Sequence, residues 1–406
     1  MNYWKNENWW ISNYNFCDEV RRGIDIKPGI KLHDATLRDG EQTPGIVLKK
    51  DEKVEIARRM SEAGIHRIEA GMPAVSEEDR SAIEEIKKLG LKTQVFSFAR
   101  AMAEDIKMAA DCGADGVVIE VPIGKPKLEL QFKWEVDRVI EMSLKGIQAA
   151  REYSLYTVLF PYDTTRADET DLDRFLSVIM AECPPDSIGL VDTMGSALPM
   201  AIRYLTRYVK EKTKLPVEIH THNDFGLSLA GSIEAVLSGA EVVHCCMNGI
   251  GERTGNCATE EVAAALQLLL GVELGIEMQK LVELSGLVET MTGFRLAANK
   301  PIVGEGNFTR ESGIGADTLL KAPLAMFAIN PGFLGREPRL VLGKKSGLTS
   351  IEMKLKALEI ELDQESKSNL LKDVKNMGIE KKRYLTDEEF LGLLKKYRKQ
   401  AKKSGS

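Results

Sequence analysis

The chain has 406 residues, 43% of them hydrophobic and 29% charged, and its 55 Lys and Arg against 61 Asp and Glu give a formal net charge of −6. This composition is typical of a soluble globular protein. The mild acidity argues against a general binder of nucleic-acid backbones, which would normally carry a strongly basic face.

Residues 1–28 are predicted to form an aromatic arm. It carries three of the four tryptophans, Trp4, Trp9 and Trp10, and so many large rings need a surface to pack on, either the chain's own barrel or a second subunit. The arm lacks the basic start and apolar stretch of a signal peptide, and no later run approaches 18 apolar residues. Because the six cysteines are scattered and form no C-x-x-C pair, we expect a cytoplasmic protein without a membrane span.

Residues 29–275 alternate short β-like runs with amphipathic helical segments, which is the pattern of βα units that build a parallel sheet. The expected strands are residues 30–36, 66–72, 92–98, 116–121, 155–160, 187–193, 217–222 and 241–246. Eight such units predict an α/β fold of the (β/α)8 TIM-barrel class as the catalytic domain. A doubly wound sheet is the alternative, but no G-x-G-x-x-G follows the first strand. Residues 276–406 read as a mainly helical accessory region, a linker plus a subdomain.

The segment His220-Thr-His222-Asn-Asp224 suggests a metal site at the end of the seventh strand. Residues two apart on a strand point the same way, so both imidazoles can reach one ion. An H-x-H pair also arises by chance or through core packing, but this chain has only five histidines. Asp39 is the candidate third ligand, since barrel closure brings strands one and seven together. Such a set suits Mn, Mg, Zn, Co or Fe(II).

Three further features lie at the ends of predicted strands. Arg38 would face oxyanions on a metal-bound substrate or form a loop ion pair. Glu69 would orient Arg38, transfer a proton, or form a structural ion pair. The glycine-rich segment 249–256 offers backbone amides and an arginine to an anionic or carbonyl-bearing ligand, or makes a tight turn.

Three segments together resemble the DRE-TIM metallolyase superfamily: HDATLRDGEQ (33–42), HTHND (220–224) and GIGERTGN (249–256). Within it they resemble the Claisen-condensing branch of isopropylmalate, homocitrate and citramalate synthases. The likeness covers residues 30–270 and extends to KPIVGEGNF, ESGI and LGKKSG in the accessory region. It implies an acyltransferase of amino-acid biosynthesis that condenses acetyl-CoA with a 2-oxo acid, needs a divalent metal (Mn, Mg, Zn or Co) and forms a homodimer.

The resemblance also implies roles for individual residues. The implied metal ligands are Asp39, His220 and His222, with Asn256 in or near the shell. The implied catalytic groups are Arg38, which polarises the ketone, Glu69, which supports Arg38, and Asp163. The implied substrate-binding residues are Gln42, Arg100, Thr193, Gly249, Gly251, Glu252, Arg253 and Gly255.

Two departures from the family pattern affect proton transfer. Family members commonly read H-x-SGIH in the accessory region, where this chain has Arg310-Glu-Ser-Gly-Ile-Gly315, so the last histidine is missing. A tyrosine expected further on is replaced around Met326 and Phe327, and the strand-five signature is one residue short. Either proton transfer falls to Glu311, Asp163 or Tyr162, or the reaction differs.

The alternative function is therefore a metal-dependent carbon–carbon lyase of the hydroxymethylglutaryl-CoA lyase or aldolase kind. Lyases of the first kind carry a cysteine in the loop after strand eight, whereas this chain has Gly-Glu-Arg there and a cysteine only at position 257. A non-catalytic barrel would leave the metal triad without a purpose. The identities of the oxo acid and of the metal stay open, because one methylene in an apolar pocket is worth only about 1 to 3 kcal/mol.

Overall fold

The computed structural model describes residues 3–313 and 315–401, which form two compact units. One unit spans Asn13–Leu296, and the other combines the residues up to Ser12 with those from Ala297 onward. These limits differ from the expected boundaries after residues 28 and 275. Ile314, in the ESGI segment, lies outside the described residues.

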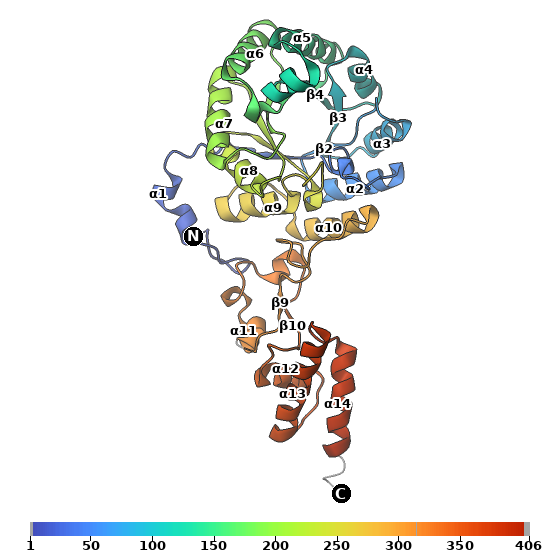
Figure 1. Ribbon diagram of the computed structural model, residues 1–406, viewed down its shortest axis with the longest axis vertical. Coiled ribbons are helices and arrows are strands. Elements are labelled where there is room, and N and C mark those ends of the chain that lie inside the picture. Colours follow the sequence, from blue (N-terminus) through green and yellow to red (C-terminus); the bar gives the residue numbers. More distant parts are fainter. Residues whose placement is uncertain (1–2, 314, 402–406) are drawn as a thin grey trace. The chain divides into compact units, whose positions relative to one another are not determined.

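The first unit is built on a closed barrel of eight parallel strands that follow one another in chain order (Figure 1). The strands are β1 (Lys31–Asp34), β2 (Arg67–Glu69), β3 (Gln94–Arg100), β4 (Gly116–Pro122), β5 (Tyr156–Tyr162), β6 (Ser187–Asp192), β7 (Val217–Thr221) and β8 (Val242–Cys245). β8 pairs with β1, where Leu32 lies opposite Val243. Each of the eight segments expected to be strands overlaps one of these strands, so the predicted TIM barrel is confirmed.

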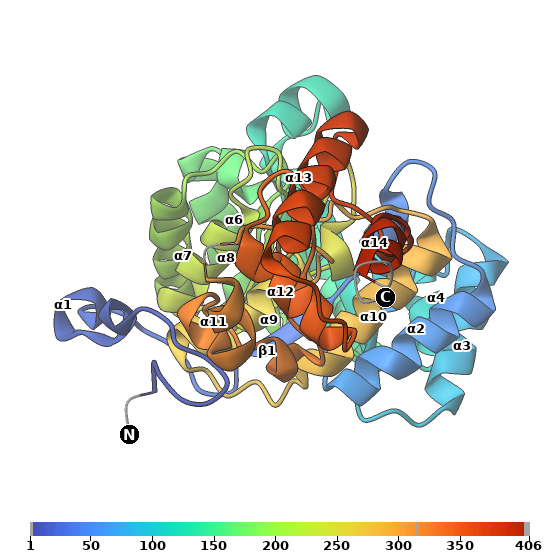
Figure 2. The same ribbon diagram turned by 90° about the horizontal axis from the view of Figure 1, so that it is seen from below.

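The short helix α1 (Asp18–Arg21) precedes β1. The helices that follow the strands and cover the barrel are α2 (Lys50–Ala63), α3 (Glu77–Lys88), α4 (Ala103–Asp111), α5 (Val136–Glu152), α6 (Glu169–Glu182), α7 (Pro199–Thr213), α8 (Ser228–Leu237), α9 (Thr259–Ala264) and α10 (Met278–Thr292). Local signals fix their ends: the Ser76 side chain accepts from the Asp79 amide at the start of α3, and Gly64 ends α2 at φ 91°. α10 packs against α2 (Figure 2), and so lies in the barrel unit.

The interior of the barrel contains a cluster of buried apolar side chains. Phe96, Phe98, Val118, Val158, Phe160 and Val191 form one buried cluster from neighbouring strands. Because residues two apart on a strand face the same way, the next inward residue of each strand lies one layer nearer the carboxyl ends of the strands. The apolar cluster therefore supports a layer of side chains at the barrel mouth, where TIM-barrel active sites lie.

The second unit is mainly helical, as expected. It contains β9 (Thr309–Arg310), β10 (Arg339–Leu340), α11 (Ala316–Lys321), α12 (Leu348–Ala357), α13 (Gln364–Lys381) and α14 (Asp387–Ala401). α13 packs against both α12 and α14, and Ile351, Val374 and Phe390 from these helices meet in one buried core. None of the helices in residues 3–313 and 315–401 is long and apolar enough to cross a membrane.

The N-terminal arm is divided between the two units. Trp9 forms a β-bridge with Ile329 and places its ring 5.6 Å from that of Phe333. The surface that receives this tryptophan is thus the accessory region of the same chain and not the barrel. Packing of the arm on a second subunit stays a prediction. Residues from Asn13 onward join the barrel unit, where the Asp25 amide donates to the Leu237 carbonyl at 2.8 Å.

Candidate active site

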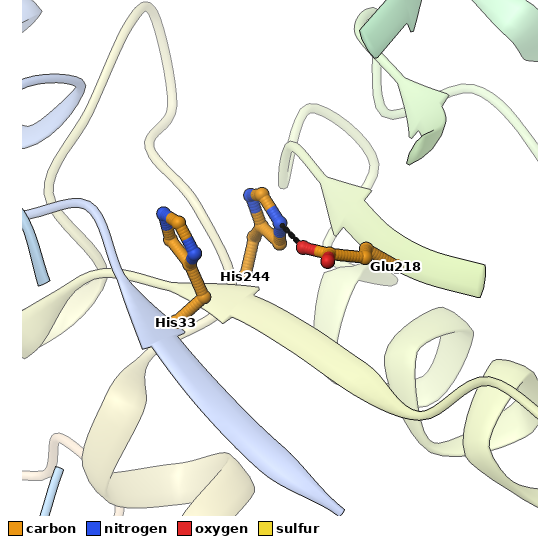
Figure 3. A group of neighbouring side chains, drawn as sticks. All are labelled: His33, Glu218 and His244. Carbon is orange, nitrogen blue, oxygen red and sulfur yellow. Dashed lines mark hydrogen bonds and ion pairs between the residues drawn. The ribbon is translucent and has the colours of Figure 1, made fainter. Parts of the chain in front are cut away.

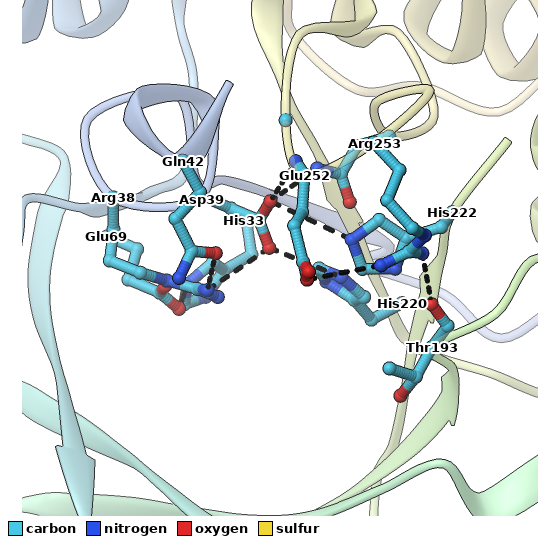
Figure 4. Close-up of polar contacts among 12 residues, drawn as sticks. His33, Arg38, Asp39, Gln42, Glu69, Thr193, His220, His222, Glu252 and Arg253 are labelled. Carbon is cyan, nitrogen blue, oxygen red and sulfur yellow. Dashed lines mark hydrogen bonds and ion pairs between the residues drawn. The ribbon is translucent and has the colours of Figure 1, made fainter. Parts of the chain in front are cut away.

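Three side chains expected to bind a metal meet at the mouth of the barrel. One oxygen or nitrogen from each of Asp39, His220 and His222 lies within 4.8 Å of the others, and all three residues are buried. The Nε2 atom of His220 is 3.6 Å from Asp39 Oδ2, and that of His222 is 3.7 Å from Asp39 Oδ1. Figure 4 shows the Asp39 carboxylate between the two imidazoles and the Arg38–Glu69 pair.

The donor atoms of this triad fit a divalent ion. Both ring nitrogens of His222 and Nδ1 of His220 are buried without a hydrogen-bond partner in the described part of the chain, and such groups are costly unless something binds them. Two imidazoles and one carboxylate form a mixed nitrogen and oxygen set. Asn256 adjoins it, because its Nδ2 donates to Asp39 Oδ1 at 2.9 Å.

Arg38 is fixed beside the triad by four contacts. Its Nε donates to Glu69, while Nη1 donates to Asp39 Oδ2 at 3.1 Å and to Gln42 Oε1 at 3.3 Å. Its guanidinium also lies 3.9 Å from the centre of the Phe98 ring. Nη2 is buried and has no partner within the described residues. Nη2 of Arg38 is therefore available to donate to a ligand, while Nε and Nη1 hold the guanidinium in place.

Glu69 stays ionised although it is fully buried. Burial alone would raise the pKa of its carboxyl, but the neighbouring Arg38 and a hydrogen bond from His33 lower that pKa to about 2. His33 Nε2 lies 3.1 Å from Glu69 Oε2 and must donate, because an ionised carboxylate only accepts. Burial, together with nearby His244, lowers the pKa of His33 to about 4.

A second buried polar cluster, absent from the sequence-based site, lies beneath Glu69. The His33 and His244 rings stack with centroids 4.2 Å apart, and His244 Nε2 is 2.8 Å from Glu218 (Figure 3). Arg67 donates to Glu218 at 2.8 Å. Each histidine thus already engages a carboxylate through Nε2, and Arg67 neutralises Glu218. We assign the cluster to positioning Glu69 and Arg38, although its atoms are also close enough together for a metal ion.

The glycine-rich loop after β8 uses its backbone amides internally. The amides of Gly249, Gly251 and Gly255 donate to the Cys246 carbonyl, to Thr43 Oγ1 and to the Glu252 carbonyl. The Glu252 amide donates to Asp39 Oδ1 at 3.3 Å. Of the two alternatives for this loop, these hydrogen bonds agree with the tight turn. The glycines are needed for the turn, since all three have positive φ.

Gly251 also permits a close approach to the metal ligands. A Cβ there would lie 2.1 Å from Asn256 Nδ2 and 2.9 Å from Asp39 Oδ1. In the same loop, Arg253 donates to both Asp224 oxygens, at 2.9 and 3.0 Å, and to the Thr193 carbonyl. The loop therefore holds the triad in place from the β8 side.

Two other candidate residues are engaged in ion pairs. Asp163 is buried and accepts from Nε and Nη2 of Arg166 at 2.9 and 2.7 Å, and its amide donates to Thr193 Oγ1 at 2.7 Å. Arg100 makes a bidentate pair with Asp105, at 2.7 and 2.9 Å, and its side chain is 53% exposed. Within the described residues, neither side chain bonds directly to Arg38 or to a member of the triad.

The other groups considered for proton transfer differ in their surroundings. Burial and the nearby Glu120 raise the pKa of Tyr162, so this phenol stays protonated near neutral pH. Glu311 Oε1 accepts from the Lys345 amide at 2.9 Å within the accessory unit. Gly315, at φ 73°, immediately precedes α11.

The sequence matches two family models. Residues 29–288 match the HMGL-like model, and residues 302–382 match the model described as homocitrate synthase post-HMGL domain-like.

Several curated synthases have sequences similar to this chain. Homocitrate synthase AksA of Methanothermobacter thermautotrophicus is 37% identical over 91% of this chain and 94% of its own length. The 2-isopropylmalate synthase of Methanocaldococcus jannaschii is 37% identical over 90% of this chain and 71% of its own. The (R)-citramalate synthase CimA of the same organism is 36% identical over 90% of this chain and 74% of its own.

Solved structures share the barrel. The HMG-CoA lyase of Bacillus subtilis superposes with a TM-score of 0.61 at 16% identity, covering 68% of this chain and 98% of that one. An HMG-CoA lyase from Pseudomonas aeruginosa gives a TM-score of 0.60 at 18% identity, over 69% of this chain and 98% of that one. At this level of identity the likeness concerns the fold alone.

Proposed function

The chain belongs to the HMGL-like family and, within it, to the Claisen-condensing synthases, and from this premise we propose that it joins the acetyl group of acetyl-CoA to the keto carbon of a 2-oxo acid. The observation that carries the proposal is the buried Asp39, His220 and His222 triad beside an Arg38 donor without a partner among the described residues.

Asp39, His220 and His222 would hold the divalent metal, with Asn256 adjoining. When bound, the metal supplies a Lewis acid that polarises a carbonyl and attracts a carboxylate. Asn256 donates to the Asp39 oxygen that faces His222 and so fixes the orientation of that carboxylate. The identity of the metal, whether Mn, Mg, Zn or Co, belongs to the same proposal.

Arg38 would stabilise negative charge on the former ketone oxygen. A guanidinium held by Glu69, Asp39 and Gln42 needs no reorganisation as the charge develops. Its Nη2 supplies the donor, and Phe98 beneath it limits its movement. Glu69 acts as a positioning residue, because its own carboxylate is fully buried and occupied by Arg38 and His33.

Thr193, Gln42 and Arg100 would contact the oxo acid, and the loop from Gly249 to Gly255 would face acetyl-CoA. Because the glycine amides of this loop are used internally, we propose that it acts by shape and through Glu252 and Arg253. Asp163 would act as a base only after releasing Arg166, so its first role is to hold Arg166 and, through its amide, Thr193.

The reaction balances with water as the only further reactant. A base removes a proton from the methyl group of acetyl-CoA, the resulting carbanion attacks the keto carbon, and the ketone oxygen receives a proton. Water then cleaves the thioester and releases CoA thiol, which makes the overall condensation favourable.

Synthesis is favoured over the lyase alternative by two observations. The curated relatives that match over about nine tenths of the chain are synthases, whereas the lyases resemble it in fold. The cysteines near the mouth, Cys245, Cys246 and Cys257, are all buried. Burial raises the pKa of the first two thiols well above its usual range, which opposes formation of a thiolate.

The test is release of CoA thiol from acetyl-CoA by purified protein with Mn or Mg and one of pyruvate, 2-oxoisovalerate, 2-oxoglutarate or oxaloacetate. The proposal predicts release that depends on both the metal and one oxo acid. A His220→Ala variant is the control and should lose metal and thiol release together. Thiol release by metal-free His220→Ala protein at the wild-type rate would contradict the proposed site.

Two coarser expectations complete the proposal: the enzyme acts in amino-acid biosynthesis in a reducing cytoplasm, and it forms a homodimer. The family resemblance supports both, and the six free cysteines agree with the first. Light scattering during size-exclusion chromatography should give a mass of twice 45.0 kDa; a single-chain mass at micromolar concentration would contradict the dimer.

A further inference from the structure

Glu120 places a carboxylate in the inward-facing layer at the mouth of the barrel. It lies opposite Arg100 on β3 and Phe160 on β5 in the strand register. Paired residues of parallel strands point to the same side of the sheet. The ring of Phe160 is 5.3 Å from that of His220, so Phe160 points inward, and Glu120 does so as well.

Glu120 also lies close to Arg38. Val118, two residues before Glu120 on the same face, is paired with Phe98, and the Arg38 guanidinium rests on the Phe98 ring. Arg38, Glu69 and Arg100 are the charges that act most strongly on Glu120. The carboxylate of Glu120 therefore lies close to Arg38 at the barrel mouth, beside the group proposed to polarise the ketone.

This carboxylate has no hydrogen bond or ion pair within the part of the chain that the structure describes. Burial accordingly raises the pKa of Glu120, an effect that Arg38 only partly offsets. The arginines around the mouth are already paired with other carboxylates: Arg38 with Glu69, Arg100 with Asp105, Arg166 with Asp163, and Arg253 with Asp224.

Lys127 is a nearby cation that forms no ion pair among the described residues. Its Nζ lies 6.0 Å from the centre of the Tyr162 ring, on the segment after β4. The ammonium group of Lys127 is thus directed at Tyr162, on the neighbouring strand β5. Because a cation could also affect binding of a second carboxylate, Lys127 is tested separately from Glu120.

The carbon chain of a bound oxo acid would extend toward Glu120. A 2-oxo acid that presents its carboxylate and keto oxygens to β1 and β7 directs its remaining carbons away from those strands. β3, β4 and β5 lie across the barrel from them. A second carboxylate at the end of that carbon chain would approach Glu120, and like charges brought together in a partly buried site repel strongly.

We propose that Glu120 is a specificity-determining residue that excludes 2-oxo acids with a second carboxylate, so that the substrate is a monocarboxylic 2-oxo acid. This inference rests on the proposed function, because it takes the metal triad and Arg38 as the site that binds the 2-oxo acid group. Glu120 acts here through its charge, and no catalytic step is assigned to it.

The test measures binding without turnover. Mn-loaded protein is titrated by calorimetry with 2-oxoglutarate and with 5-methyl-2-oxohexanoate, which has an isopropyl group in place of the second carboxylate. The proteins are wild type, Glu120→Gln, Lys127→Ala and Glu129→Gln. Glu129, 60% exposed in the segment after β4, is the matched control for loss of one negative charge.

The wild-type protein should bind 5-methyl-2-oxohexanoate at least about tenfold more tightly than 2-oxoglutarate. Glu120→Gln should reduce this ratio about tenfold or more, while Glu129→Gln should keep the wild-type ratio. A ratio unchanged in Glu120→Gln, tighter wild-type binding of 2-oxoglutarate, or failure of both acids to bind would overturn the inference. A decrease of this ratio in Lys127→Ala as large as that in Glu120→Gln would also overturn the inference.

The same proteins are then assayed for thiol release with acetyl-CoA. Absence of thiol release with every acid would defeat the proposed function, whereas the binding ratio would still decide the role of Glu120. The two failures are thereby distinguished.

Discussion

Replacing Glu69 by glutamine should both destabilise the barrel and disable Arg38. The glutamine side chain keeps the shape of glutamate and can still accept a hydrogen bond, but it removes the charge that faces the guanidinium. The side chains of Glu69 and Arg38 are 0% and 9% exposed, so water screens this pair little. Breaking a buried ion pair from one side costs about 3 to 5 kcal/mol, because the remaining charge stays buried.

We expect Glu69→Gln to lower the free energy of unfolding of the barrel unit by about 3 kcal/mol, the lower end of that range, because Asp39 still faces Arg38 at 3.1 Å. Urea titration can follow this unit through the fluorescence of Trp134. Trp4, Trp9 and Trp10 precede the barrel unit, so they are replaced by phenylalanine to leave Trp134 as the reporter. The kcat should fall at least about a hundredfold, as when a donor to a developing oxyanion is lost.

A double-mutant cycle separates the pair from its surroundings. Arg38→Met removes the other charge, and the double variant Arg38→Met/Glu69→Gln should be more stable than the sum of the two single effects predicts, because neither charge is then left alone. Additive effects, or a Glu69→Gln protein within about 0.5 kcal/mol of wild type, a change usual for an inconsequential substitution, would refute the reasoning.

Three further variants test separate parts of the site. Arg38→Ala should keep metal affinity, measured by Mn titration, and lose turnover at least about a hundredfold; parallel loss of metal would contradict its assigned role. Gly251→Ala should weaken Mn binding about tenfold or more, because its Cβ would displace Asn256, whereas Gly286→Ala, with open space in α10, should not. Since the pKa of His33 is about 4 in the folded protein and about 6.5 unfolded, the unfolded state binds the proton first as pH falls. Between pH 6.5 and 4 this group should lower the free energy of unfolding of the wild type by up to about 3 kcal/mol, and above pH 6.5 it should have no effect. The urea midpoint of His33→Gln should fall less over the same pH range, and an equal fall would contradict the assigned role of His33.

The barrel was predictable from the sequence because its signals are local and repeated. Each βα unit shows an apolar run followed by an amphipathic helix, and polar residues such as Asp39 and His220 come where the strands end. Barrel closure then follows from the number of units, and it brings residues of β1 and β7 together although they lie far apart in the sequence.

The use of the glycine-rich loop could not be predicted in the same way. Its sequence is equally compatible with amides that face a ligand and with amides that close a turn. The choice depends on Thr43, a residue distant in sequence, whose Oγ1 accepts a hydrogen bond from the Gly251 amide at 2.7 Å. Packing of Trp9 on the accessory region depends likewise on a contact with Phe333, far along the chain.

The inward direction of Glu120 and the stacking of His33 on His244 depend on strand register, which periodicity gives only to within a residue or two. A shift of one residue would turn Glu120 outward among the helices. One signal was nonetheless present, because a glutamate in the apolar run GVVIEV lacks a reason to be there in a purely structural strand.

The central claim is that this site forms a carbon–carbon bond between acetyl-CoA and a 2-oxo acid. The most direct test is mass spectrometry of the products after Mn-loaded enzyme is incubated with acetyl-CoA labelled with 13C in both acetyl carbons and with each oxo acid in turn. The account predicts a new hydroxy dicarboxylic acid that contains every carbon of one monocarboxylic oxo acid plus both labelled carbons, with free CoA in equal amount. Oxo acid and acetyl-CoA recovered unchanged from a metal-bound, folded enzyme, together with cleavage of a hydroxyacyl-CoA by the same preparation, would contradict it.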